Sequence, residues 1–176
     1  MNGQAVSVQP SAPRGLAEGD QVEVAAGGLA RIAYPDGTRM LLLANGSKAG
    51  ALVIAKPAGG VGDVVLKLLN GAVSFLIPKD RQPNANYQFQ ALNTVTTIKG
   101  TSGRITTAAE ADQVALREGV VVVTATASGT MTEVKAGSEV VVEPGKAPVV
   151  RAYNTTASSE LPFWDFEKAN RLYGTH

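Results

Sequence analysis

Between residues 15 and 153 the sequence is a succession of short runs of β-branched and aliphatic residues, each closed by glycine or another turn residue. Runs that recur about every 8 to 12 residues are typical of sandwiches and other all-β folds. The pattern predicts an all-β fold of stacked, twisted sheets that is sandwich-like or solenoid-like. The predicted strands are residues 21–25, 30–34, 39–43, 51–55, 63–69, 72–77, 87–92, 95–98, 103–107, 112–116, 120–126, 131–134, 139–142 and 149–153.

Alternation within the runs indicates which faces are buried. Val22 and Val24 point to one side of their predicted strand while the polar residues between them point to the other, so this strand is half-buried. Residues 120–123 and 140–142 are instead unbroken runs of valine. A strand that is apolar on both sides is expected in the centre of a fold. Both runs are therefore predicted to be buried on both faces.

Turn residues predict how neighbouring strands connect. Pro35 presets φ and Gly37 accepts a positive φ, so residues 34–38 should join two antiparallel strands. The Asn-Gly pairs at residues 45–46 and 70–71 are suited to type I′ hairpin turns for the same reason. Each pair is therefore predicted to reverse the chain.

Side chains that catalysis uses are scarce. Cys is absent, and the only histidine, His176, is the last residue. Glu110 and Asp112 are close in sequence, but they fall in an alanine-rich stretch that runs up to the first residue of the predicted strand 112–116, where neither burial nor a partner would shift a pKa. Both are interpreted as solvated loop residues. The sequence predicts a protein that is not an enzyme and that uses no cofactor and no metal.

The charge and hydropathy patterns exclude two classes of partner. The 16 Lys and Arg residues are scattered and the net charge is +1, so the sequence offers no basic patch for nucleic acid. Its apolar runs are far shorter than the roughly 20 residues that cross a bilayer. We therefore expect neither nucleic-acid binding nor a direct membrane span. The first residues lack a secretory signal, which fits a cytoplasmic protein or one whose signal has been removed.

Aromatic residues gather near the C-terminal end, where Ser159 can cap and Pro162 can begin a short helix. One interpretation is that this helix packs back over an open end or edge of the β-domain. The other is that it anchors the chain in a groove of another protein, because Trp and Tyr are typical binding hot spots. The predicted partner-binding residues are Phe163, Trp164, Phe166 and Tyr173.

Three segments of the sequence stand out together: residues 19–24 with the turn at 35–38, residues 98–105, and residues 119–122 with 137–145. In their order and spacing they resemble the FecR-like domain of bacterial cell-envelope proteins. A Gly-Asp followed by alternating residues, an Asp-Gly-Ser/Thr turn, a central Val-Arg-Gly-Thr and a late Gly-Val-Val strand mark that family. Two positions depart from the pattern, since Lys99 stands where Arg is usual and Gly103 where an aromatic is usual. The matching positions include Asp36, Gly37, Lys99, Gly100, Thr101 and Gly119.

The resemblance implies an all-β periplasmic domain without catalytic chemistry. It favours a non-enzymatic scaffold or interaction module of a cell-envelope or outer-membrane assembly, with other envelope proteins as partners and a homo-oligomer or ring as one form of that assembly. Two alternatives stay open. One is a module that binds cell-wall glycan or polysaccharide, and the other is an extracytoplasmic signalling domain of a sigma-factor regulatory system.

The sequence also suggests three parts. Residues 1–15 are expected to be an N-terminal extension and residues 16–153 the FecR-like β-domain. Residues 154–176 are expected to form a tether followed by the aromatic C-terminal helix.

Overall fold

The computed structural model describes residues 14–34, 36–55, 64–79 and 86–154, and every regular element in these ranges is a β-strand. The all-β prediction is therefore confirmed, whereas the predicted C-terminal helix lies outside the described residues. The strands are β1 (Gln21–Val24), β2 (Leu29–Ala33), β3 (Arg39–Leu43), β4 (Gly50–Ala55), β5 (Val64–Leu76), β6 (Tyr87–Gln90), β7 (Thr94–Ile98), β8 (Ser102–Thr107), β9 (Asp112–Glu118), β10 (Val120–Ala125), β11 (Met131–Lys135), β12 (Ser138–Val142) and β13 (Val149–Ala152).

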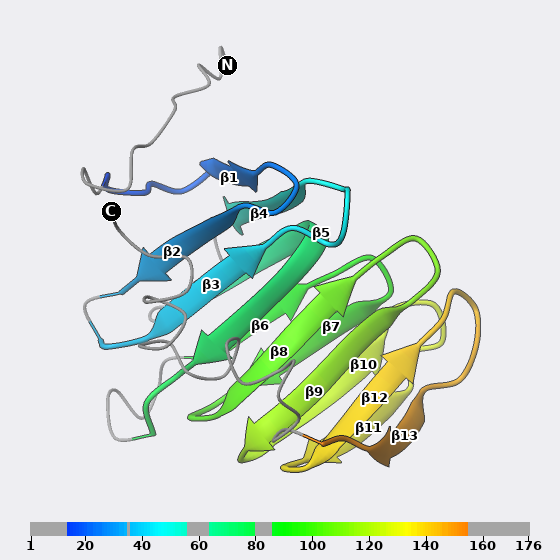
Figure 1. Ribbon diagram of the computed structural model, residues 1–176. Coiled ribbons are helices and arrows are strands. Elements are labelled where there is room, and N and C mark those ends of the chain that lie inside the picture. Colours follow the sequence, from blue (N-terminus) through cyan, green and yellow to red (C-terminus); the bar gives the residue numbers. More distant parts are fainter. Residues whose placement is uncertain (1–13, 35, 56–63, 80–85, 155–176) are drawn as a thin grey trace.

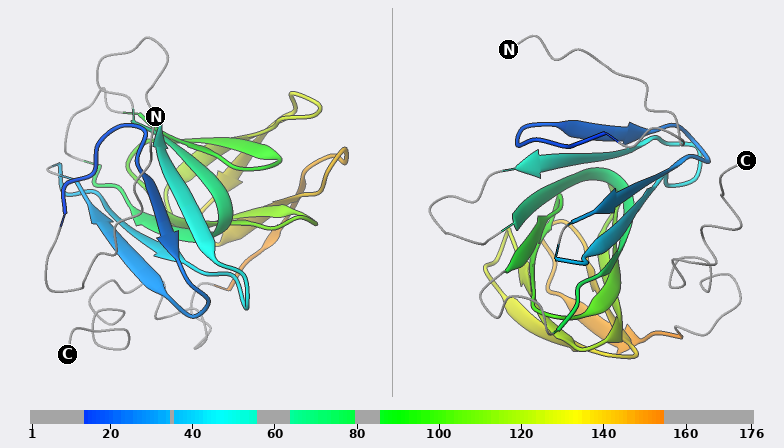
Figure 2. Two further views of the ribbon diagram at one scale, coloured as in Figure 1. Left: turned by 90° about the horizontal axis from the view of Figure 1, so that it is seen from above. Right: turned by 90° about the vertical axis from the view of Figure 1, so that its left-hand side faces the viewer.

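The strands form one continuous sheet that folds over into two facing layers, nearly closed like a barrel (Figures 1 and 2). Layer A has the order β1-β4-β5-β6-β7-β10-β11, and layer B has the order β2-β3-β5-β8-β9-β12-β13. Strand β5 belongs to both layers. Every pairing is antiparallel except that between β5 and β6.

The shared strand β5 changes layer in its middle. Its first half pairs with β4 and β6 in layer A, and its second half pairs with β3 and β8 in layer B. Gly71 adopts φ 100° at the change, and a Cβ there would lie 2.4 Å from the carbonyl oxygen of Leu43. The predicted hairpin turn at Asn70 and Gly71 is therefore wrong. The glycine bends one long strand instead of reversing the chain, and a register shift opposite Ala51 and Leu52 adds to the bend.

Successive hairpins alternate between the two layers. The β6–β7 and β10–β11 hairpins lie in layer A, and the β8–β9 and β12–β13 hairpins lie in layer B. This alternation does not show the solenoid character that the sequence suggested, at least within the described residues. A glycine of positive φ stands at each described crossing between layers: Gly27, Gly46, Gly71, Gly100, Gly119 and Gly137.

The other predicted turns fall into two classes. Gly37 N donates to Tyr34 O at 3.0 Å between the paired strands β2 and β3, which confirms the predicted turn. Lys48 N likewise donates to Asn45 O at 3.1 Å, so residues 45–48 form a turn. Asn45 and Lys48 also form an antiparallel bridge, so the chain reverses at this pair as predicted, although β3 and β4 on either side of the turn lie in different layers.

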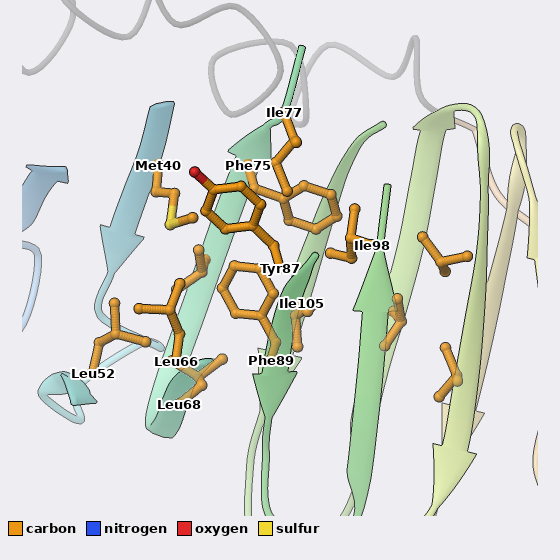
Figure 3. Close-up of a cluster of buried hydrophobic side chains, with 14 of the residues drawn as sticks. Met40, Leu52, Leu66, Leu68, Phe75, Ile77, Tyr87, Phe89, Ile98 and Ile105 are labelled. Atoms are coloured by element: carbon orange, nitrogen blue, oxygen red, sulfur yellow. The ribbon is translucent and has the colours of Figure 1, made fainter. Parts of the chain in front are cut away.

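The core fills the space between the layers with side chains from both (Figure 3). The rings of Phe75 from layer B and Phe89 from layer A stack with centroids 5.5 Å apart, and both are fully buried. Stacking adds about 0.5 to 1.5 kcal/mol to the burial of two rings. Both phenylalanines therefore belong to the core and join the two layers.

The valine run in β10 alternates instead of being buried on both faces. Val121 and Val123 point into the core, whereas Val120 and Val122 are 47% and 41% exposed. The prediction for residues 120–123 is therefore wrong. No described strand covers the outer side of layer A. An unbroken run of valines, which is typical of a strand buried on both faces, therefore occurs here in a strand with one open face.

The two faces of β10 lead to a first expectation. Val121→Asp places an unpaired charge among Ile98 and Val134 and should lower the free energy of unfolding by about 3 to 5 kcal/mol. Val122→Asp makes the same chemical change one residue later on the open face and should cost less than about 1 kcal/mol. Urea unfolding of the two variants measures the difference, and equal losses would contradict the observed facing.

Gly103 stands where FecR-like domains usually have an aromatic residue, and side chains of neighbouring strands fill the space beside it. It pairs with Phe75 on β5 and with Leu116 on β9, and all three face the core. A Cβ at Gly103 would lie 2.5 Å from Phe75 Cζ and 2.7 Å from Leu116 Cδ2. Phe75 therefore occupies the space that a larger residue at position 103 would need.

Moving the large side chain from position 75 to position 103 tests this packing. Phe75→Ala should lower the free energy of unfolding by about 3 to 5 kcal/mol because it leaves a cavity, and Gly103→Phe alone should also destabilise by overpacking. The double variant should lose less free energy of unfolding than the two single variants lose together, by at least about 1 kcal/mol. Urea unfolding of all four chains gives the coupling. Strict additivity would show that the two positions do not share one space.

Candidate interaction surfaces

Asp36 organises the turn between β2 and β3. Its Oδ1 accepts a hydrogen bond from Thr38 N at 2.8 Å, and its Oδ2 accepts from Tyr87 OH at 2.5 Å and from Thr38 Oγ1 at 3.2 Å. Tyr87 belongs to layer A, so the carboxylate ties the turn of one layer to a strand of the other. The Tyr34 ring meets the Tyr87 ring edge-on at 5.7 Å.

The electrostatics of this cluster indicate a structural role. Burial opposes ionisation of Asp36, but the hydrogen bonds from Tyr87 and Thr38 outweigh it and hold the pKa of Asp36 below its usual value. Burial first, and the nearby Asp36 second, raise the pKa of Tyr34 to about 12. Burial and the hydrogen bond to Asp36 raise the pKa of Tyr87 further. A stably ionised carboxylate held by neutral donors stabilises a turn and offers no proton for chemistry at neutral pH.

The other family-motif positions surround the crossings between β7 and β8 and between β9 and β10. Gly100 and Gly119 both have positive φ, and a Cβ at Gly119 would lie 2.4 Å from Thr101 Cγ2. Thr101 is buried and its carbonyl accepts from Ile77 N at 2.9 Å. Lys99 is exposed beside them. These residues bring the two crossings into contact, and only Lys99 offers a charged group to the surface.

Asp112 is a second carboxylate with several hydrogen bonds, and the sequence predicts that it is solvated. It is instead fully buried at the start of β9, so that interpretation is wrong. Its Oδ2 accepts from Asn93 N at 2.6 Å and from Thr94 Oγ1 at 3.1 Å, and its Oδ1 accepts from Thr107 Oγ1 at 2.5 Å. The carboxyl group thus joins the β6–β7 turn of layer A to the β8–β9 hairpin of layer B.

Burial dominates the electrostatics of Asp112. Desolvation raises its pKa, and the hydrogen bonds from Thr107, Asn93 and Thr94 only partly offset this. A carboxyl group whose pKa is raised on folding contributes most stability below its unfolded pKa, and the contribution is lost as pH rises through the folded pKa. The sequence around Asp112 does not indicate this site, because the donors Asn93 and Thr94 belong to a different hairpin.

Two substitutions separate the charge of Asp112 from its hydrogen bonds. Asp112→Asn can accept from Asn93 N and Thr94 Oγ1 and donate to Thr107 Oγ1, so it keeps the contacts without the buried charge. Asp112→Ala leaves Asn93 N without an acceptor and should cost about 1 to 3 kcal/mol. Relative to wild type, the Asn variant should gain stability as the pH of urea unfolding rises from about 4 to 7. A constant difference across this range would contradict the raised pKa.

The described residues contain no cluster of side chains that could hold a metal ion. No group of three or more His, Cys, Asp or Glu residues gathers within residues 14–34, 36–55, 64–79 and 86–154. Nor does this part of the chain contain a helix long and apolar enough to cross a membrane. The four predicted partner-binding aromatics lie outside the described residues: Phe163, Trp164, Phe166 and Tyr173.

Layer A presents an exposed apolar area on its outer side. The cross-strand partners Thr97, Val122 and Glu133 lie in one row, and Val95, Thr124 and Met131 lie in the next. Paired residues project to the same side of a sheet. Met131 is 74% exposed, so it extends the exposed valines of β10 toward the edge strand β11. We call this area, made by Val95, Val120, Val122 and Met131, the layer A face.

Comparison with known proteins assigns the family. The family model described as FecR protein matches residues 20–122, which is more than half of the chain. The chain belongs to the FecR family. The match begins just before β1 and ends within β10, so it spans both layers and includes both glycine crossings described above. A search of curated proteins finds no match.

Solved structures show that the fold has precedent. Two crystal structures of a protein described as a "putative anti-sigma factor" from Parabacteroides distasonis ATCC 8503 have TM-scores of 0.66 and 0.64 to this FecR-family chain. Each is 14% identical to it and matches 81% of its length. The chain in turn spans 65% of the length of those structures. At this identity the similarity concerns the fold.

Proposed function

We propose that this FecR-family domain is an extracytoplasmic regulatory module that acts by binding another protein. The FecR match across most of the two-layer fold is the observation that carries the proposal. The fold similarity to a "putative anti-sigma factor" supports regulation ahead of the scaffold role that the sequence favoured. In this proposal the domain resides in the periplasm and its partner is an envelope protein of the same signalling system.

Binding is favoured over catalysis by the chemistry of the described residues. The two best-connected carboxylates, Asp36 and Asp112, accept hydrogen bonds that tie one layer to the other. Neither borders a group of further acidic, histidine or cysteine residues. A module built this way recognises partners through shape and apolar contact.

A glycan-binding role has weaker support. Sugar rings usually stack on exposed aromatic side chains, yet Phe75, Phe89 and Tyr87 are buried in the core of the described fold. Tyr34 packs against Tyr87 and is partly buried. These four aromatic residues therefore stabilise the fold and do not form a platform.

We propose the layer A face as the surface that contacts the partner. Val120 and Val122 are exposed in the middle of this area, and Met131 adds a flexible apolar side chain at the edge. Glu133 and Lys135 pair at 3.3 Å along its rim. An apolar centre with a charged rim is the usual anatomy of a protein interface.

Regulation can be tested in the native host by transcript profiling. Deleting the gene should change the transcript levels of a defined set of genes, and Val120→Arg with Val122→Arg should reproduce that change because two charges would have to be desolvated on binding. The melting temperature of the purified variant should stay within about 2 °C of wild type, because both residues are exposed. Glu110→Arg, an exposed change on the β8–β9 loop, serves as the control and should behave as wild type.

The other functions give different results in the same strains. A scaffold role predicts that an envelope complex is lost while the transcript profile of the deletion strain is unchanged. A glycan-binding role predicts that the purified chain sediments with purified peptidoglycan. Either result without a transcript response would overturn the regulatory proposal.

A further inference from the structure

The outer side of layer B contains buried side chains that do not belong to the core. The pairing of the strands places one row of outward-facing residues across layer B. The row begins at Arg31, passes through Leu41 and ends at Arg151. Five side chains on this side of the sheet are no more than 5% exposed. They are Leu41, Leu43, Ala72, Ser74 and Ala115. We call them the layer B face.

Their burial is unexpected for the outer side of a two-layer fold. Met40 and Leu42 alternate with Leu41 along β3 and point into the core, so Leu41 points away from it. All thirteen strands lie in the two layers, and no described strand covers layer B from outside (Figure 2). The contrast with the exposed valines on the outer side of layer A is marked.

One residue of the layer B face is polar and has no partner. Ser74 is fully buried, and its Oγ makes no hydrogen bond. Burying a hydroxyl without a hydrogen bond costs about 1 to 3 kcal/mol by mutational measures. The five positions of the face are therefore apolar or small, with one available hydroxyl, and Arg104 lies between Ser74 and Ala115 in the same row.

We propose that the layer B face binds the chain's own C-terminal segment, residues 160–173, in an intramolecular contact. This inference does not depend on the proposed function. The segment contains the aromatic residues that need an apolar surface, and the face offers Leu41 and Leu43 beside the small residues Ala72, Ser74 and Ala115. Phe163, Trp164 and Phe166 can each bury about 150 to 250 Å² against such a surface.

Charge also matches the two surfaces. The exposed Arg31 and Arg39 lie on the outer side of layer B, at the edge formed by β2 and β3. The segment contains two basic residues, Lys168 and Arg171, in its second half, whereas its aromatic part, residues 160–167, contains only acidic charges. These are Glu160, Asp165 and Glu167. Opposite charges around an apolar contact favour this pairing and orient it.

The connection is long enough for the contact. Strand β13 is the edge of layer B and ends at Ala152, five strand spacings from β3 in the order of the sheet. At about 4.8 Å per spacing the distance across the layer is about 24 Å. The 11 residues from Ala152 to Phe163 can span about 36 Å when extended. Phe163 can therefore reach Leu41 without disturbing β13.

Trp164 provides a direct measurement because it is the only tryptophan of the chain. In the full-length protein its emission should be blue-shifted relative to the chain unfolded in urea. Its acrylamide quenching constant should be several-fold lower than in the unfolded chain. An emission maximum and a quenching constant equal to those of the unfolded chain would overturn the proposal.

Variants on the layer B face identify the surface. Arg31→Glu with Arg39→Glu should raise the quenching constant and shift the emission to the red, because the acidic segment is then repelled. Ala115→Glu should have the same effect through bulk and charge. Both exposed arginines can be changed without touching the core, so the first variant stays informative where Ala115→Glu fails to fold.

Matched controls exclude other contacts. Lys67→Glu and Lys99→Glu make the same charge change at exposed positions away from the layer B face and should leave the emission unchanged. An equal effect of these controls would overturn the assignment to the layer B face. A blue shift that disappears on dilution, with a dimer in light scattering, would show that the segment binds a second copy instead. Trp164 that becomes protected only when an envelope partner is added would likewise overturn the intramolecular contact.

Discussion

The fold depends on the chain's ability to cross from one layer to the other within a few residues. Each described crossing uses a glycine of positive φ, a conformation that costs other L-residues about 1 kcal/mol or more. Gly71 shows the constraint most clearly, because it bends a single strand so that β5 can serve both layers. Gly119 shows the second reason for glycine, since Thr101 occupies the space of any side chain there. Without these positions the hairpins would extend one open sheet and would enclose no core.

Positions of strands are encoded locally, which is why they could be predicted from the sequence. Alternating apolar residues and turn residues mark nearly every strand that the structure contains. Strand pairing is less local. An Asn-Gly pair permits both a hairpin and a bend, and the outcome at residues 70–71 depends on the approach of Leu43 and Gly50 from other strands. The sequence around the pair does not contain that information.

The candidate surfaces were harder to predict than the strands, for the same physical reason. The burial of Asp112 depends on donors from another hairpin, and the exposure of Val122 depends on the lack of a described third layer over β10. The family residues were readable as a motif, but their roles follow from contact between two crossings far apart in sequence. The placement of Phe163, Trp164, Phe166 and Tyr173 stays a prediction.

The two outer faces of this fold differ in a way that bears on regulation. Layer A exposes valines and a methionine, whereas layer B buries Leu41, Leu43 and an unpaired hydroxyl on its outer side. An uncovered apolar face is available to a partner at once. A face that is covered by a segment of the same chain is available only when that segment leaves, and a ligand of the segment or of the face then shifts the balance by its differential affinity. In the two proposals made above, layer A presents a constant binding surface and layer B a conditional one, because a sheet that folds over into two layers leaves two outer sides that can bind different segments.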